Sequence, residues 1–240
     1  MQAKCQVDMT YGDISKQLFM FTIPILLSQI LQQFYNIADT AIIGRYIGTD
    51  ALAAIGSTGL LISVIVNFFI GLSTGVSAVI ANQFGANEYD KLKKSISTLL
   101  AVSVLLGIVF TIGSLIFMKP IINILQTPKG VYSLAIDYLK ICFLGITFQL
   151  LYNIGTAILR ALGNTKDPLY FLIFSCILNL ILDILFIVYF GWGVKGAAIA
   201  TLISQILATL LVMYKIMSLD DNCKLSLKQI KIYRGYTKDI

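Results

Sequence analysis

Histidine is absent from this 240-residue chain, and charged residues make up only 12% of it. A soluble domain carries about 25% charged residues, so a fold with half that share has too little polar surface to face water. The deficit excludes the soluble class of proteins. It also changes the meaning of the net charge of +6, which in a soluble protein would suggest nucleic-acid binding. Here the basic residues lie between apolar runs and indicate membrane orientation, so no nucleic-acid partner is expected.

Cysteine is scarce as well and is not grouped. The four cysteines, Cys5, Cys142, Cys176 and Cys223, show no C-x-x-C spacing. Without histidine or paired cysteines, the sequence offers no zinc or haem site. Nothing in it resembles a catalytic triad or a phosphate-binding Walker loop. We therefore expect a protein that is not an enzyme and has no cofactor.

Long apolar runs are what the chain has in abundance. A helix that spans the hydrocarbon core of about 30 Å needs about 20 mostly apolar residues. Short loops that combine glycine, proline and charge separate the runs, so successive helices should be antiparallel. Six segments meet the length requirement: 15–45, 51–83, 94–118, 131–160, 168–190 and 195–217. The sequence therefore predicts an all-α membrane protein with six transmembrane helices.

Basic residues fall unevenly on the two sides of this arrangement. One side carries both termini, the second-to-third loop and the fourth-to-fifth loop, and it holds thirteen lysines and arginines. The opposite side holds four, namely Arg45, Lys119, Lys129 and Lys195. Cytoplasmic loops carry the excess of basic residues. Both termini are therefore predicted to be cytoplasmic, in a multi-pass protein surrounded by the lipids of the cell (inner) membrane.

Two aspartates stand inside predicted spans, Asp39 in the first and Asp183 in the fifth. An ionised aspartate at the centre of a span costs about 2.5–3.5 kcal/mol, whereas a hydrogen bond inside the membrane contributes about 0.6 kcal/mol. A purely structural role for two protonated aspartates is therefore the weaker interpretation. Both carboxylates fall in the outer half of helices that run outward, and Asn179 lies one turn before Asp183 on the same face. These groups could hold Na⁺, or one carboxylate could exchange a proton with water.

A faint internal repeat has the interval that separates the two aspartates. Ala53-Ala54-Ile55 recurs 144 residues later as Ala197-Ala198-Ile199. The match extends little further and could be coincidence. If it is structural, it brings Ser57 or Thr58, and Thr201, near the carboxylates.

Other residues within the spans are helix-breaking or polar. Pro24 removes one backbone hydrogen bond from the first predicted helix, and we expect a passive kink or a hinge there. Asp137 and Lys140 have the spacing of a local ion pair. Asn153 adds polar surface to the fourth span, which indicates a water-filled cavity.

Several of these residues belong to longer motifs, and together the motifs resemble the multidrug and toxin extrusion (MATE) transporters of the MOP superfamily, in their DinF-like branch. The resemblance covers nearly the whole chain, and the motifs occur in the family's order and spacing. They are QFYNIADT at 33–40, LAA at 52–54, ANQFGA at 81–86, LRALGNTK at 159–166 and GAAIAT at 196–201.

The resemblance implies cation-driven antiport, in which Na⁺ or H⁺ enters as the coupling ion while a small, amphipathic and often cationic organic compound leaves. It implies a cation site formed by Asp39, Asn179, Asp183 and Thr201. Tyr138 and Asn153 match polar positions that line the same cavity. Pro24 matches a first-helix proline associated with bending when the site is protonated, which favours the hinge over the passive kink.

One departure from the family concerns length. The family has twelve helices in two pseudo-symmetric lobes, and this chain corresponds to the N-terminal lobe alone. On this interpretation residues 1–14 form a cytoplasmic segment, 15–217 the six-helix lobe, and 218–240 a basic interlobe linker or truncated tail. The missing C-terminal lobe is then the partner that alternating access requires.

Two alternative functions stay open at this point. One is a lobe of a lipid-linked oligosaccharide flippase, which should line its cavity with more basic residues. The other is a truncated remnant that does not transport.

Overall fold

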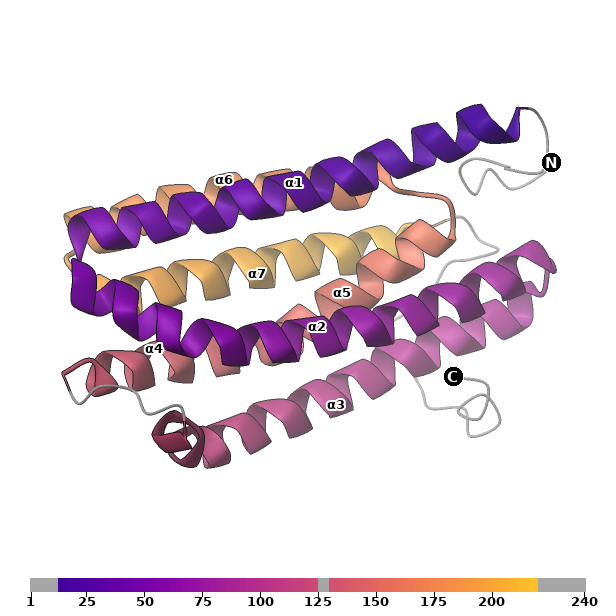
Figure 1. The fold of residues 1–240 in the computed structure, drawn as a ribbon. Coiled ribbons are helices and arrows are strands. Elements are labelled where there is room, and N and C mark those ends of the chain that lie inside the picture. The colour runs from indigo at the N-terminus through magenta and orange to yellow at the C-terminus, as the bar shows by residue number, and fades with distance from the viewer. Residues whose placement is uncertain (1–12, 125–129, 220–240) are drawn as a thin grey trace.

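The structure, a computed structural model, describes residues 13–124 and 130–219. Within these ranges the chain is almost entirely helical and contains no β-strand (Figure 1). The elements are α1 (Ile14–Tyr46), α2 (Thr49–Gly85), α3 (Tyr89–Ile124), α4 (Tyr132–Leu144), α5 (Ile146–Ala161), α6 (Lys166–Asp183), the π-helix η1 (Ile184–Tyr189) and α7 (Gly193–Met217). The predicted terminal segments, 1–14 and 218–240, lie almost wholly outside the described residues and stay predictions.

These helices form six membrane-spanning segments in the described part of the chain. Five are continuous helical stretches, which are α1, α2, α3, α6 with η1, and α7. The sixth is the pair α4 and α5, which meet at a bend of 45°. The predicted fold class is therefore confirmed, and the chain is a multi-pass helical membrane protein.

Gly145 separates α4 from α5, where the sequence predicts one unbroken span over 131–160. A Cβ atom at this position would lie 2.8 Å from Oε1 of Gln205 and 3.3 Å from Cδ1 of Leu202. Glycine thus allows α7 to approach the backbone at the bend. From the bend, α5 runs obliquely between α2 and α7 (Figure 1).

The core forms around α5, which contacts α2, α3 and α7. Gly107 of α3 lies so close to this helix that a Cβ atom there would be 2.8 Å from Cα of Thr147. On the other side of α5, the Ser77 hydroxyl of α2 donates a hydrogen bond of 3.1 Å to the Ala157 carbonyl. Small and hydroxylated residues therefore hold the helices together here, as is usual where lipid provides no hydrophobic driving force.

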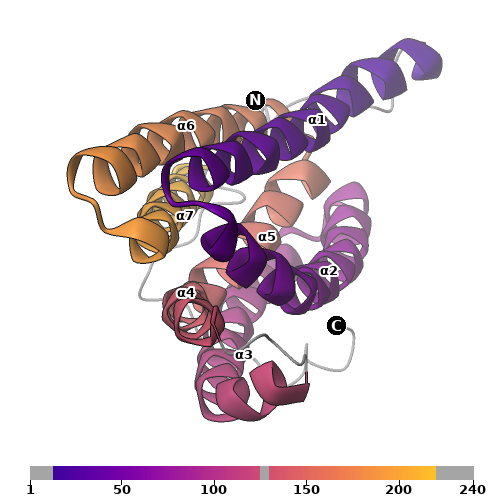
Figure 2. The same cartoon turned by 60° about the vertical axis from the view of Figure 1, so that its left-hand side comes forward.

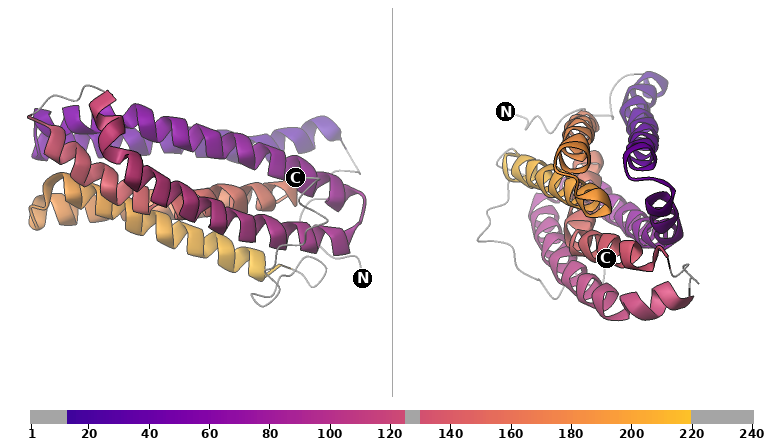
Figure 3. Two further views of the ribbon diagram at one scale, coloured as in Figure 1. Left: turned by 90° about the horizontal axis from the view of Figure 1, so that it is seen from below. Right: turned by 90° about the vertical axis from the view of Figure 1, so that its left-hand side faces the viewer.

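Two groups of helices make up the lobe. Figure 2 shows α1, α6 and α7 on one side and α2, α3, α4 and α5 on the other, and α7 also contacts α4 and α5. Figure 3 shows the same helices from below and from one end. Large apolar side chains remain exposed on the outer surface, and examples are Leu60, Phe117 and Tyr214 with exposed fractions of 71%, 60% and 68%. Such a surface suits contact with lipid.

The fifth span changes helix type directly after Asp183. Residues Ile184–Tyr189 form the π-helix η1, and Phe186 within it stacks on Trp192 at a ring-centroid distance of 5.0 Å. Gly196 of α7 makes room for this segment, because a Cβ atom there would lie 3.2 Å from the Phe186 carbonyl carbon. π-helical turns are rare and are frequent at functional sites.

Candidate functional site

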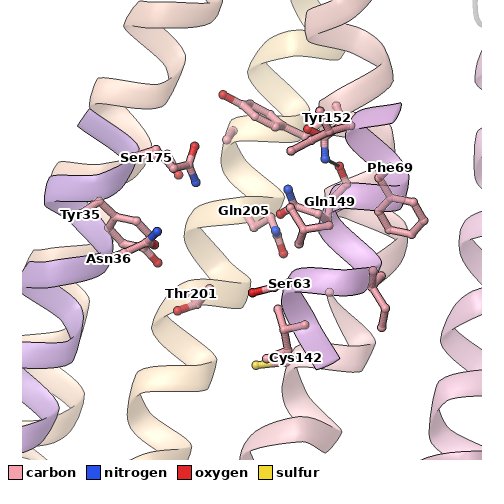
Figure 4. Close-up of a pocket in the computed structure, with 18 of the residues that line it drawn as sticks. Tyr35, Asn36, Ser63, Phe69, Cys142, Gln149, Tyr152, Ser175, Thr201 and Gln205 are labelled. Atoms are coloured by element: carbon pink, nitrogen blue, oxygen red, sulfur yellow. Dashed lines mark hydrogen bonds between the residues drawn. The ribbon is translucent and has the colours of Figure 1, made fainter. Parts of the chain in front are cut away.

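A cavity of about 810 Å³ lies between the two groups of helices. Residues from α1, α2, α4, α5, α6 and α7 line it. Figure 4 shows Tyr35 and Asn36 of α1 on one side, with Thr201 and Gln205 of α7 and Gln149 of α5 among the other lining residues. Hydroxyl and amide side chains alternate with apolar ones in this lining, so the cavity is suited to an amphipathic ligand.

Asp39 and Asp183 meet at this cavity, as predicted from their depth in the two spans. Asp39 is half-buried and lines the cavity, whereas Asp183 is completely buried behind it. Helices α1 and α6 pack against each other, and the two carboxyl groups are close enough to interact electrostatically. Oδ1 of each aspartate is buried and has no hydrogen-bond partner among the described residues.

Asn179 holds the other oxygen of Asp183. With its amide oriented so that both ends are satisfied, Nδ2 donates to Oδ2 of Asp183 at 2.8 Å, and the amide oxygen accepts from the Thr201 backbone N–H at 3.1 Å. Asn179 is 1% exposed, so this amide has no contact with water. It therefore links α6 to α7 and fixes the direction in which Asp183 points.

Thr201 of α7 lies beside Asn179 and lines the cavity. Its hydroxyl lies 3.4 Å from the Asn179 amide, and Thr201 lines the same cavity as Tyr35. The internal repeat predicted Thr201, and Ser57 or Thr58 of α2, near the carboxylates. Of these residues, only Thr201 lines the cavity. Ser57 and Thr58 donate to the Ala54 carbonyl at 2.9 and 3.1 Å and do not line the cavity, since each satisfies its hydroxyl within its own helix.

Tyr35 is a site residue that the motif contained but that sequence reasoning did not single out. It lies one turn before Asp39 on α1, so both side chains face the same cavity. The i, i+4 spacing was the signal that could have found it. Tyr138 of α4, which the family resemblance implies, is buried in the wall of this cavity with an exposed fraction of 8%.

Asn153 also lines the cavity, but it does not join the aspartates. Its Nδ2 donates to the Gln149 carbonyl one turn earlier on α5, at 2.9 Å. No hydrogen bond from Asn153 to either aspartate occurs in the described part of the chain. It therefore contributes polar surface at another part of the cavity.

Pro24 lies fifteen residues before Asp39 on α1. Helix α1 continues through it without interruption from Ile14 to Tyr46, and Pro24 is buried. The Ser28 hydroxyl donates to the Pro24 carbonyl at 2.7 Å. The proline still removes one backbone donor, so α1 has a weak point between its first turns and the aspartate.

The expected ion pair between Asp137 and Lys140 is wrong. Asp137 pairs instead with Lys195, at an N–O distance of 3.2 Å, and this contact joins α4 to the start of α7. Lys140 is exposed and does not line the cavity. The helical spacing suggested a local partner, but the tertiary fold brought a lysine from another span closer.

The chemistry of the aspartate pair follows from its surroundings. Two ionised carboxylates repel each other strongly in an apolar environment, so a shared proton or a bound cation is needed to neutralise them. Carboxylate, amide and hydroxyl oxygens suit a hard cation and not a soft transition metal. Residues 13–124 and 130–219 contain no group of three or more acidic, cysteine or histidine side chains that could hold a metal ion.

Comparison with known proteins identifies relatives of this fold and site. The family model MatE matches residues 24–185. The chain is 34% identical over 203 residues to "Probable multidrug resistance protein YpnP" of Bacillus subtilis (strain 168), which covers 85% of this chain and 46% of that protein. It is 32% identical over 202 residues to "FAD transporter" of Shewanella oneidensis. This match covers 81% of this chain and 44% of that protein.

A solved structure has the same architecture. The "outward-facing conformation of a multidrug resistance MATE family transporter of the MOP superfamily" superposes with a TM-score of 0.87 and 28% identity, over 95% of this chain and 51% of that one. The chain thus spans about half the length of the relatives it matches. These proteins are transporters and not enzymes, which agrees with the interpretation of the sequence. The matched model, the shared motifs and the common architecture show that this chain belongs to the MATE family of membrane transporters.

Proposed function

We propose that this chain forms the cation-coupling lobe of an antiporter that exports amphipathic organic compounds in exchange for Na⁺ or H⁺. The observation that carries the proposal is the pair Asp39 and Asp183, whose facing carboxyl groups each keep one buried oxygen without a partner. Aspartates inside a membrane protein are costly and mark ion or substrate pathways. Here they lie together, at the wall of a cavity of drug-sized volume.

Asp39 and Asp183 have different roles in this proposal. Asp39 lines the cavity, so a substrate or water in the cavity reaches it directly. Asp183 is fully buried and receives a hydrogen bond from Asn179, so it stabilises the ion or proton that Asp39 exchanges. Cation binding neutralises the pair, and release of the cation restores a negative site that attracts a cationic substrate.

The orientation of Asn179 bears on the coupling ion. Its amide nitrogen faces Asp183, and its oxygen is already used by the Thr201 backbone N–H. In this arrangement Asn179 and Thr201 position Asp183, and the two free carboxylate oxygens are neutralised by a shared proton. A Na⁺ site built from Asp39, Asn179, Asp183 and Thr201 requires the amide to rotate so that its oxygen faces the cation. The proposal therefore keeps both Na⁺ and H⁺ as coupling ions.

Membrane orientation and substrate class follow from other observations. The excess of basic residues on the side that carries both termini supports a cytoplasmic location for the termini and insertion in the cell membrane. The relative named for multidrug resistance supports export of drug-like compounds. A flippase lobe is not favoured, because only one basic residue, Arg160, is found among the described residues that line the cavity.

Reconstitution tests the proposal most directly. The protein is expressed from its complete reading frame and placed in proteoliposomes, and ethidium is added while the internal pH and Na⁺ are followed with dyes. Substrate addition should start a proton flux in the opposite direction, or a sodium flux if Na⁺ is the coupling ion. Ethidium movement that starts neither flux would contradict the coupling.

A further inference from the structure

Arg160 is the second charged residue in the cavity, and the proposed coupling mechanism does not use it. Of the described residues that line the cavity, Asp39 is the only acidic residue and Arg160 the only basic one. Arg160 lies in the last turn of α5 and is half-buried. It thus lies near the predicted cytoplasmic end, whereas Asp39 lies in the predicted outer half.

No acidic side chain in the described part of the chain pairs with Arg160. Within residues 13–124 and 130–219, its guanidinium forms no ion pair and no hydrogen bond. Asp167 follows closely in the sequence but is already engaged, because its Oδ2 accepts from Asn164 at 2.6 Å and pairs with Lys215 at 2.8 Å. Asp167 is therefore bonded to Asn164 and Lys215 and forms no ion pair with Arg160.

Tyr152 provides a second hydrogen-bond donor on the wall of the same cavity. Tyr152 lies two turns before Arg160 on α5, lines the same cavity and is close enough to interact with it electrostatically. The Tyr152 hydroxyl has no hydrogen-bond partner in the described part of the chain. A guanidinium and a phenol hydroxyl that both lack acceptors form a donor pair for an oxyanion.

A helix-capping role alone does not explain this arrangement. A cation in the last turn of a helix interacts favourably with the helix dipole, but an exposed side chain achieves that without entering a cavity. Bringing a guanidinium partly out of water without a counter-charge is unfavourable. Arginine binds planar oxyanions through two parallel hydrogen bonds, so an anionic ligand would supply what the site lacks.

We propose that Arg160 and Tyr152 form an anion-binding subsite, which takes the phosphate or carboxylate of an amphipathic organic compound held in the cavity. The inference rests on the proposed function, since it names the charge class of a substrate of the same cavity. A ligand that reaches both charged residues has its anionic group at Arg160 and a cationic or polar group towards Asp39. The same oxyanion chemistry is offered by a soluble organic phosphate and by the headgroup of an anionic lipid.

A pair of flavins that differ in one phosphate tests the subsite. The purified chain is placed in phosphatidylcholine nanodiscs, and binding of flavin mononucleotide and of riboflavin is measured by fluorescence anisotropy. We expect the mononucleotide to bind about tenfold more tightly, because a hydrogen-bonded charge pair contributes that much or more. Arg160→Gln should abolish the preference, and Arg160→Lys should keep only part of it.

Lys166→Gln is the matched control for Arg160→Gln. Lys166 is exposed, lies at the start of α6 and does not line the cavity, so its loss removes the same charge without touching the subsite. This variant should keep the full preference for the mononucleotide. Retention of helicity by circular dichroism shows that each variant is folded.

Repeating the measurement in nanodiscs that contain phosphatidylglycerol separates the two sources of the anion. A preference that persists in both membranes assigns the subsite to soluble anions, and one that disappears only with phosphatidylglycerol assigns it to a lipid headgroup. Equal binding, or no binding, of the two flavins in phosphatidylcholine would overturn the proposal, as would a preference that survives in Arg160→Gln. Asp39→Asn should keep the flavin preference, so failure of the coupling site and failure of this subsite are distinguishable.

Discussion

Nδ2 of Asn179 lies 2.8 Å from Oδ2 of Asp183, one helical turn later on α6, whereas Oδ1 of Asp183 has no hydrogen-bond partner among the described residues. The amide oxygen of Asn179 is held in turn by the Thr201 backbone on α7 at 3.1 Å. The direction of one buried carboxylate therefore depends on two neighbouring helices. A residue that positions a charged group in this way should affect coupling more than it affects substrate binding.

Asn179→Ala tests this positioning. Removal of the amide leaves Oδ2 of Asp183 buried without a donor, at a cost of about 1–3 kcal/mol, so coupled efflux should fall about tenfold or more. Asn153→Ala is the comparison, because Asn153 lines the same cavity and bonds only to the Gln149 carbonyl. We expect it to change the apparent affinity for ethidium more than the dependence on the ion gradient. The same ion dependence in both variants as in wild type would contradict a special role for Asn179.

The contact between α3 and α5 predicts a stability effect. Gly107→Ala should lower the melting temperature of the purified chain, because the added Cβ would lie 2.8 Å from the Thr147 backbone, and overpacking costs about 1–3 kcal/mol. Gly113→Ala on the same helix is the control, since no atom lies within 4 Å of a Cβ built there. Intrinsic fluorescence during heating measures the melting temperatures of both variants. Equal melting temperatures for the two variants would show that α3 and α5 are not in this contact.

Pro24 gives a prediction about motion. Pro24→Ala restores a backbone donor in α1 and should make the helix stiffer near its start, so expression and fold should persist while ethidium efflux falls several-fold. Spin labels at two exposed positions on either side of residue 24 should show a narrower distance distribution in the variant. An unchanged distribution together with full efflux would leave Pro24 without a hinge role.

The ion pair between Asp137 and Lys195 should contribute little. Its side chains are 40% and 59% exposed, and exposed pairs contribute about 0–1 kcal/mol. Lys195→Gln should therefore shift the melting temperature only slightly, and added salt should reduce even that shift. A large loss of stability would mean that the contact between α4 and α7 matters more than its exposure indicates.

Much of this architecture could be predicted from the chain. Apolar runs of spanning length gave the six segments, because lipid demands continuous helices and continuous helices leave a plain compositional pattern. The depth of Asp39 and Asp183 predicted that they can meet, and the one-turn spacing placed Asn179 on the same helix face as Asp183. These are local or one-dimensional properties, which a sequence displays directly.

Other features depend on tertiary contacts and leave no such pattern. The bend at Gly145 follows from the approach of Gln205 on a helix some sixty residues later. The π-helix after Asp183 lies in an ordinary run of apolar residues, and the stacking of Phe186 on Trp192 is visible only once the chain turns back. For the same reason, the sequence predicts an ion pair between Asp137 and Lys140, although the partner in the structure is Lys195.

The most direct test of the central claim is ion-gradient-driven ethidium efflux in cells that express the complete reading frame with Asp39→Asn or Asp183→Asn. Asp137→Asn, outside the cavity, is the matched control. The account predicts that each of the first two variants is inserted at wild-type levels but loses coupled efflux, while the control retains it. Wild-type efflux in both cavity variants would contradict a coupling role for the aspartate pair.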